Sequence, residues 1–252
     1  MSIPEISENS ALELWQAQSL RLTAFPAKAE IETRPTWWKY LFGEPAEKIT
    51  SQPKEFLHQE EGTLENSKFR LKIQPGRIDW ELEVSPDLPG AIEGIPVIAS
   101  FPKALNLVLP LLLRWLSVCP VLQRLAFGAK LIQPVSGHAA GYRCLNKYLP
   151  HVQLDLESSD FMYRINRRRN SVSGIPDLQI NRLTTWSVLR MILSLSAGGT
   201  PLSPMEHYAC NLQLDVNTSP ESVSELPKDK YSQLFEELVT LGKEIAIKGD
   251  IA

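Results

Sequence analysis

The sequence has few cysteines and no long hydrophobic run. Its 252 residues include only Cys119, Cys144 and Cys210, an odd and dispersed set that is typical of reduced thiols rather than of a disulfide framework. The most hydrophobic segment, residues 104–113, is far shorter than the roughly 20 apolar residues of a membrane span. The first ten residues have neither a basic nor an apolar region, so we expect no secretory signal. These features predict a cytoplasmic protein that does not enter a membrane.

The motifs of common catalytic sites are also missing from the sequence. It contains no dinucleotide-binding glycine motif, no phosphate-binding Walker loop, no calcium loop and no nucleophile elbow. Zinc needs about four converging nitrogen or sulfur ligands, and only His207 and Cys210 have the spacing of a ligand pair. His138, Cys144 and His151 are dispersed around a predicted helix. We therefore predict no metal, no cofactor and no catalytic residue, with an enzyme that has a dispersed site as an alternative.

The clearest pattern in the chain is a β-hairpin at residues 69–84. Apolar residues alternate with polar ones on both sides of Pro75-Gly76, which is the period of a strand with one buried face. Pairing Gln74 with Arg77 places Leu71 opposite Trp80 and brings all the apolar groups to one face. The hairpin therefore predicts an antiparallel sheet with one face on the core and one in water.

The remaining patterns extend this prediction to the whole chain. Further strands are predicted at residues 19–25, 54–64, 121–133 (broken near Gly128), 154–165, 178–195 and 211–217, although residues 183–195 are also compatible with a helix. Helices are predicted at residues 36–43, 101–118 and 137–148, and an amphipathic helix beginning near Pro227 closes the chain. We predict an α+β fold, with antiparallel sheet packed against a few helices, in a single domain over residues 1–252 whose two sub-halves meet near residues 86–95.

The two ends of the chain carry a family resemblance. The run SLRLTAF at residues 19–25, and NLQLDVN at residues 211–217 followed by the closing helix, resemble a sporadically distributed family of uncharacterised bacterial proteins. Those proteins have about this length and an α+β character. The resemblance implies the fold class and no activity that can be transferred to these residues.

Basic residues are concentrated in the middle of the sequence. The whole chain has a net charge of −3, but residues 114–182 carry ten basic and four acidic groups. The densest cluster is Arg164, Arg167, Arg168 and Arg169, and Arg182 follows it. Guanidinium groups bind phosphates and carboxylates well, so these five arginines are a candidate nucleic-acid or anion site. The alternatives are contact with a protein partner, a solvated loop, or ion pairs with Asp155, Glu157, Asp160 and Asp177.

Aromatic residues form the second candidate site. The predicted helix at residues 36–43 contains Trp37, Trp38, Tyr40 and Phe42. Adjacent helical residues point about 100° apart, so the two tryptophans cannot both face one core from a short helix. An exposed tryptophan often marks a contact site, and we interpret these four residues as a candidate protein-binding patch. A small sub-core is the structural alternative.

These observations predict a protein that acts by binding. We expect a non-catalytic accessory subunit of a bacterial protein assembly, with a protein partner. The alternative is a component that binds RNA or single strands through the arginine-rich loop.

Overall fold

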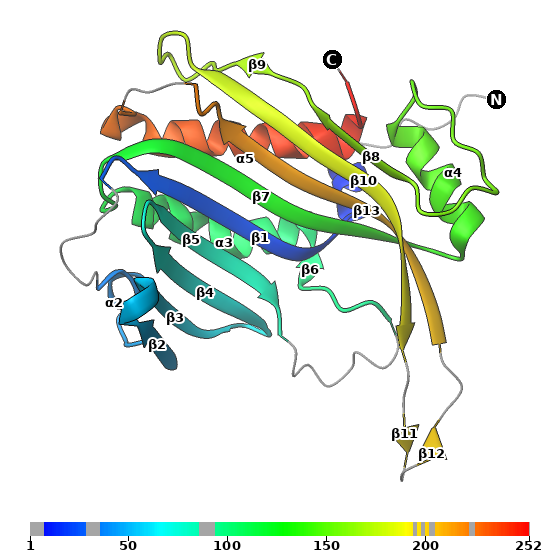
Figure 1. Ribbon diagram of the computed structural model, residues 1–252, viewed down its shortest axis with the longest axis horizontal. Coiled ribbons are helices and arrows are strands. Elements are labelled where there is room, and N and C mark those ends of the chain that lie inside the picture. The colour runs from blue at the N-terminus through cyan, green and yellow to red at the C-terminus, as the bar shows by residue number, and fades with distance from the viewer. Residues whose placement is uncertain are drawn as a thin grey trace.

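Eleven described strands form one antiparallel sheet, and nine of them make up its continuous order. The computed structural model describes residues 8–28, 36–85, 94–193, 196–197, 200–201, 205–221 and 225–251. The strands follow the spatial order β2-β3-β4-β5-β1-β7-β13-β10-β8 (Figure 1). Their bounds are β1 Gln16–Pro26, β2 Lys48–Gln52, β3 Leu57–Leu64, β4 Ser67–Gln74, β5 Arg77–Val84, β7 Leu122–Val135, β8 Met162–Asn166, β10 Gln179–Leu193 and β13 Met205–Thr218. Two short strands pair at the margins, β6 Ala99–Ser100 with β1 and β9 Arg169–Asn170 with β10, and β11 Ser196–Ala197 pairs separately with β12 Thr200–Pro201.

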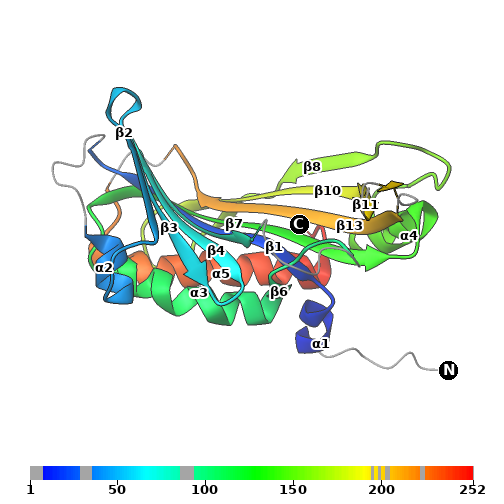
Figure 2. The same ribbon diagram turned by 90° about the horizontal axis from the view of Figure 1, so that it is seen from below.

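The helices lie on one face of this sheet. The long helices α3 and α5 run beneath its centre, and the view from below shows them together on that side (Figure 2). The helices are α1 Glu8–Glu13, α2 Trp37–Phe42, α3 Phe101–Leu116, α4 His138–Tyr148 and α5 Tyr231–Lys248, with short 3₁₀ turns at Pro53–Glu55 and Lys228–Lys230. The α+β prediction is therefore confirmed, including the closing helix, which ends at Gly249 in the left-handed region.

The predicted hairpin has the register that its alternation implied. Gln74 pairs with Arg77 and Leu71 with Trp80. Gly76 takes a positive φ of 68°, which a glycine adopts at no steric cost and which the tight Pro-Gly connection requires. The apolar residues of β4 and β5 are buried and their neighbours are more accessible, so the sheet has one dry face here.

One sequence expectation about strands needs correction. The break predicted near Gly128 is wrong, because β7 pairs in an unbroken register with β1 and β13 through that residue. Residues 183–193 belong to the long strand β10, so the strand predicted there is confirmed and the helical alternative is not. The sequence also gave no sign of the edge strand β2 as an element separate from β3. Of the boundary expected near residues 86–95, residues 86–93 lie outside the described residues.

Tryptophans anchor the core between the sheet and the helices. Trp15, Trp80, Trp115 and Trp186 are fully buried. Trp80 stacks on Phe69 and meets Trp115 of α3 edge-on, while Trp15 donates a hydrogen bond of 2.8 Å from its indole nitrogen to the carbonyl of Ala246 in α5. The same core thus connects the hairpin to both long helices.

Replacing Trp80 with alanine tests this core. We expect Trp80→Ala to lower the free energy of unfolding by about 3 to 5 kcal/mol, because a fully enclosed ring leaves a cavity. Phe56→Ala is the control, since Phe56 is 73% exposed and its loss should change stability by less than about 0.5 kcal/mol. Chemical denaturation measures both variants. Equal stability of the two would show that the buried face of the hairpin is assigned wrongly.

Candidate binding surface

The face of the sheet opposite the helices is polar and is not covered by any described helix. Residues directly opposite each other in paired strands point to the same face, so the registers identify the side chains on this side. We call it the open face. Its basic residues are Arg21, Lys48, Lys68, Arg70, Lys72, Arg77, Arg124, Lys130 and Arg164, and its acidic residues are Glu61, Asp79, Glu81, Glu83 and Asp215. These strand residues carry a net charge of +4 on a chain whose total is −3.

On the β2–β5 side of the open face, opposite charges are paired. Glu61 accepts contacts from Lys48 at 3.0 Å and Lys68 at 2.7 Å. Arg70 bridges Glu61, Glu81 and Glu83. This half of the surface is therefore largely neutralised by its own ion pairs.

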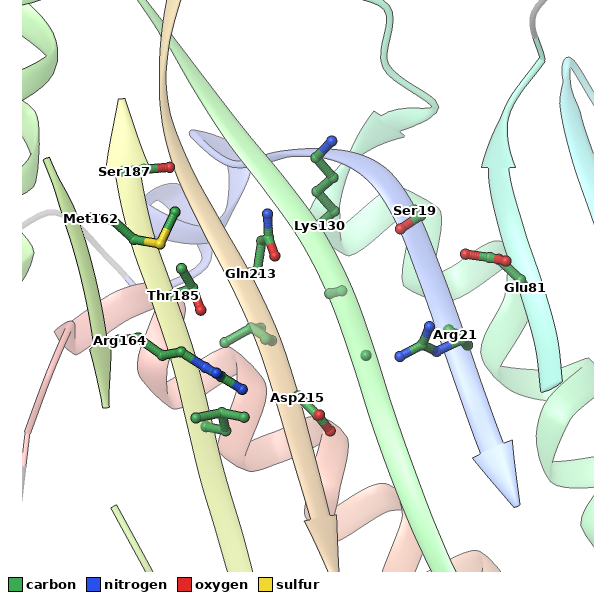
Figure 3. Close-up of a pocket in the computed structure, with 14 residues that line it drawn as sticks. Ser19, Arg21, Glu81, Lys130, Met162, Arg164, Thr185, Ser187, Gln213 and Asp215 are labelled. Atoms are coloured by element: carbon green, nitrogen blue, oxygen red, sulfur yellow. The ribbon is translucent and has the colours of Figure 1, made fainter. Parts of the chain in front are cut away.

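On the other side, from β1 to β8, the open face contains a hollow of about 520 Å³ (Figure 3). Gly128 and Ala129 of β7 form a floor of small residues. Arg164 reaches inward from β8 and Arg21 from β1, while Asp215 of β13 lies between them (Figure 3). The sequence separates these three charged residues by 50 positions or more, and the strand order brings them together.

Two cations of the hollow have no partner. Neither Lys130 nor Arg164 has an ion pair or a side-chain hydrogen bond within the described part of the chain. Asp215 instead accepts a 2.9 Å hydrogen bond from the amide of Asn217. The hollow thus contains unpaired positive charge beside polar groups from Ser19, Thr185 and Gln213.

The predicted arginine cluster divides between different environments. Arg164 lies on the open face, but the next three arginines form ion pairs with carboxylates of the same chain. Arg167 makes a bidentate pair with Asp250 at 2.9 and 3.0 Å, and Arg168 makes another with Glu221. Arg169 contacts Glu244 of α5 at 2.9 Å. The partners come from the C-terminal third of the chain rather than from the acidic residues 155–177 considered from the sequence.

Arg182, the fifth candidate, faces the helices from β10. Only 2% of its surface is exposed, and burial lowers the pKa of its guanidinium. Arg169 and Arg167 lie close enough to lower this pKa further, while Glu244 and Asp250 oppose them. The structure therefore separates Arg182 and Arg164 onto opposite faces of the sheet.

The predicted aromatic patch is mostly part of the core. Trp38 is buried against Phe42, Phe69 and Trp80, and Trp37 is half-buried against Trp115. Tyr40 is the member with an exposed ring, which lies under the guanidinium of Arg114 at 4.8 Å. A site on this helix therefore has one exposed aromatic side chain for a partner.

The histidine and cysteine candidates do not converge on a site. Among the described residues, no group of three His, Cys, Asp or Glu side chains is placed to hold a metal. Cys144 donates a hydrogen bond to Gln133 at 3.1 Å, and His138 packs edge-on against Tyr142. Contact with Cys210 lowers the pKa of the Cys144 thiol, although burial opposes this. His58 and Glu60 form a partly buried pair at 2.8 Å on the helix side of β3.

Sequence reasoning missed the hollow because its residues are dispersed among six strands. The available signal was the polar half of each alternating segment, which includes Arg21, Gln213 and Asp215. Only the strand order shows that these polar halves form one surface.

No protein-family model matches this chain, and no curated protein matches it significantly. The resemblance carried by residues 19–25 and 211–217 therefore stays a prediction. Within the described ranges, no helix combines the length and the apolar character needed to cross a membrane.

The ion cluster around Glu61 predicts a pH dependence of stability. Burial alone would raise the pKa of Glu61, but the ammonium groups of Lys68 and Lys48 outweigh it and lower the pKa from the ordinary 4.5 to about 2. A depressed pKa in the folded state stabilises the protein above pH 4.5, and this contribution is lost as the pH falls from 4.5 to 2. We expect Glu61→Gln to lack this part of the pH dependence in denaturation curves measured across that range. A variant that retains the full acid loss would assign it to other carboxylates.

The arginine pairs predict unequal effects on stability. Arg167→Ala should cost roughly 1 to 2 kcal/mol, because the carboxylate of Asp250 is almost fully buried and would lose two charged hydrogen bonds. Arg168→Ala should cost less than about 0.5 kcal/mol, since both partners of that pair are exposed. Thermal and chemical denaturation compare the two variants. Equal losses would contradict an internal role for Arg167.

Proposed function

We propose that this chain is a non-catalytic binding protein of the cytoplasm, an accessory component of a protein assembly, and that the open face is its binding surface. One observation carries the proposal. A continuous nine-stranded sheet is covered by described helices on one face only, and its other face carries a net charge of +4 on an acidic chain. An excess of positive charge on a surface favours a partner of the opposite sign.

The other surfaces considered support this proposal less well. Three of the five clustered arginines have their hydrogen-bonding capacity engaged by Asp250, Glu221 and Glu244. Most of the aromatic helix is packed into the core. The open face, by contrast, offers charged groups with no competing partner inside the described chain.

A nucleic acid is the second candidate partner. The excess of positive charge on the open face favours phosphate backbones. Against it, single-strand binding surfaces usually stack bases on aromatic rings, and Phe25 is the one Phe, Tyr or Trp that the described strands present on this face. The ring of Phe25 is already covered by the guanidinium of Arg124 at 4.6 Å. The charge fits either partner, and the scarcity of aromatic rings favours an acidic protein surface.

Affinity purification tests the proposal with a matched pair of variants. Arg164 and Arg168 are four residues apart and both exposed, but Arg164 is unpaired on the open face whereas Arg168 is paired with Glu221. We expect the tagged full chain to retain a protein partner through nuclease treatment, Arg164→Glu to lose it, and Arg168→Glu to keep it. Thermal melting of each variant checks folding.

Other results would change the proposal. Loss of the partner after nuclease treatment would favour the nucleic-acid candidate. Loss in Arg168→Glu alone would return the site to the arginine-rich loop. Retention in both variants would exclude the β8 side of the open face.

A further inference from the structure

We propose that the hollow of the open face is a subsite for a phosphate-type oxyanion, held between Arg21 and Arg164 with Lys130 at its rim. This inference rests on the proposed binding function, because the hollow is part of the open face, and it adds a phosphate-type ligand to the acidic protein surface proposed for that face. A small molecule and a nucleic-acid backbone are both sources of such a group, since each presents a tetrahedral phosphate with negative charge. Three features of the hollow carry it: the balance of charges, the environment of Arg21 and the separation of the two arginines.

The first feature is the balance of charges around the hollow. Its lining contains three cations and two carboxylates, Glu81 and Asp215. Glu81 is contacted from outside the hollow by Arg70 at 3.7 Å. Asp215 interacts with Arg124 on the neighbouring strand β7 and accepts the amide of Asn217. Arg21 lies opposite Glu81 and shares its charge, so three cations against two carboxylates leave the lining with an excess of one positive charge for an anion.

The second feature is the incomplete pairing of Arg21. Its closest carboxylate is Asp79, at 3.9 Å, and that carboxylate already accepts two hydrogen bonds from Arg77 and one of 2.6 Å from Thr23. The Nε of Arg21 is buried and has no hydrogen-bond partner among the described residues. A buried charged donor without an acceptor destabilises the protein. An oxyanion oxygen that accepted a hydrogen bond from this nitrogen would remove that penalty.

Gly128 lies beneath the guanidinium of Arg21. A Cβ at residue 128 would lie 3.4 Å from one terminal nitrogen of Arg21 and 3.5 Å from its Nε, which is about van der Waals contact. The guanidinium therefore lies directly over the floor of the hollow.

The third feature is the distance between the two arginines along the sheet. Four strand spacings separate β8 from β1, or about 19 Å between the strand axes. Both side chains extend inward from opposite sides of the hollow (Figure 3). The hollow of about 520 Å³ that they line has room for one tetrahedral oxyanion, which two planar forks can bind at once. Thr185 and Gln213, which are cross-strand neighbours between Arg164 and Lys130, add neutral donors.

Calorimetric titration of the full chain tests the subsite. The probes are pyrophosphate, a single-stranded oligouridylate and a poly-glutamate peptide, each at low salt. We expect pyrophosphate to bind, Arg164→Gln to weaken it at least tenfold, and Arg168→Gln to leave it unchanged. Arg21→Gln should also weaken binding, because it removes the guanidinium that lies over the floor of the hollow. Unfolding curves of all variants at the same salt confirm that they are folded.

The outcomes separate the subsite from the broader binding function. The subsite is supported, with a nucleic acid as the phosphate source, if the oligouridylate binds more tightly than pyrophosphate and competes with it. The subsite is supported with a small molecule as the source if pyrophosphate alone binds. Equal pyrophosphate binding by wild type and Arg164→Gln would overturn the subsite. Binding of poly-glutamate without either phosphate probe would also overturn it. If no probe binds while the purified partner still depends on Arg164, the subsite is wrong and the binding function stands.

Discussion

Burial of one face of the sheet against α3 and α5 is the constraint on which the rest of this structure depends. Every central strand contributes its apolar alternate residues to that side, where the enclosed indoles of Trp15, Trp80 and Trp115 contact the helices. A strand cannot turn one set of side chains inward without turning the other set outward. The open face is therefore a direct consequence of the core. Its side chains do not pack into the core, so packing does not restrict which residues occupy it.

The alternation made the fold predictable from local sequence, and the long-range pairings made the site unpredictable. The hairpin register followed from residues 69–84 alone, because its two strands are joined by a two-residue turn. The position of β1 between β5 and β7 did not follow, since β1 precedes both in sequence by tens of residues and pairs with each across long connections. The hollow depends on that strand order, so the sequence did not show that Arg21 and Arg164 line the same hollow. Gly128 was read as a break for a related reason: its partner, Arg21, is distant in sequence.

Local charge density was a poor guide to available charge. Four arginines in six residues attracted attention, yet Arg167, Arg168 and Arg169 are occupied by carboxylates from the C-terminal third of the chain. Asp250 immediately follows α5, so its pair with Arg167 fastens the end of the last helix to the loop after β8. Their charges are therefore engaged within the chain, and the first arginine of the cluster differs because its strand turns it to the open face.

An arginine matters for binding when its own protein leaves it unsatisfied. On the β2–β5 half of the open face each carboxylate has a nearby cation, so a partner binding there would have to displace existing ion pairs. On the β1–β8 half, Lys130 and Arg164 offer charge that is not already engaged, and Arg21 offers a buried donor with no acceptor. Removing an unpaired cation from water costs free energy, which contact with an anion offsets. A cation that already has an ion pair contributes less free energy to the binding of an anion. This asymmetry is the reason for proposing the binding site on the β1–β8 half, where two cations have no counter-charge within the described chain.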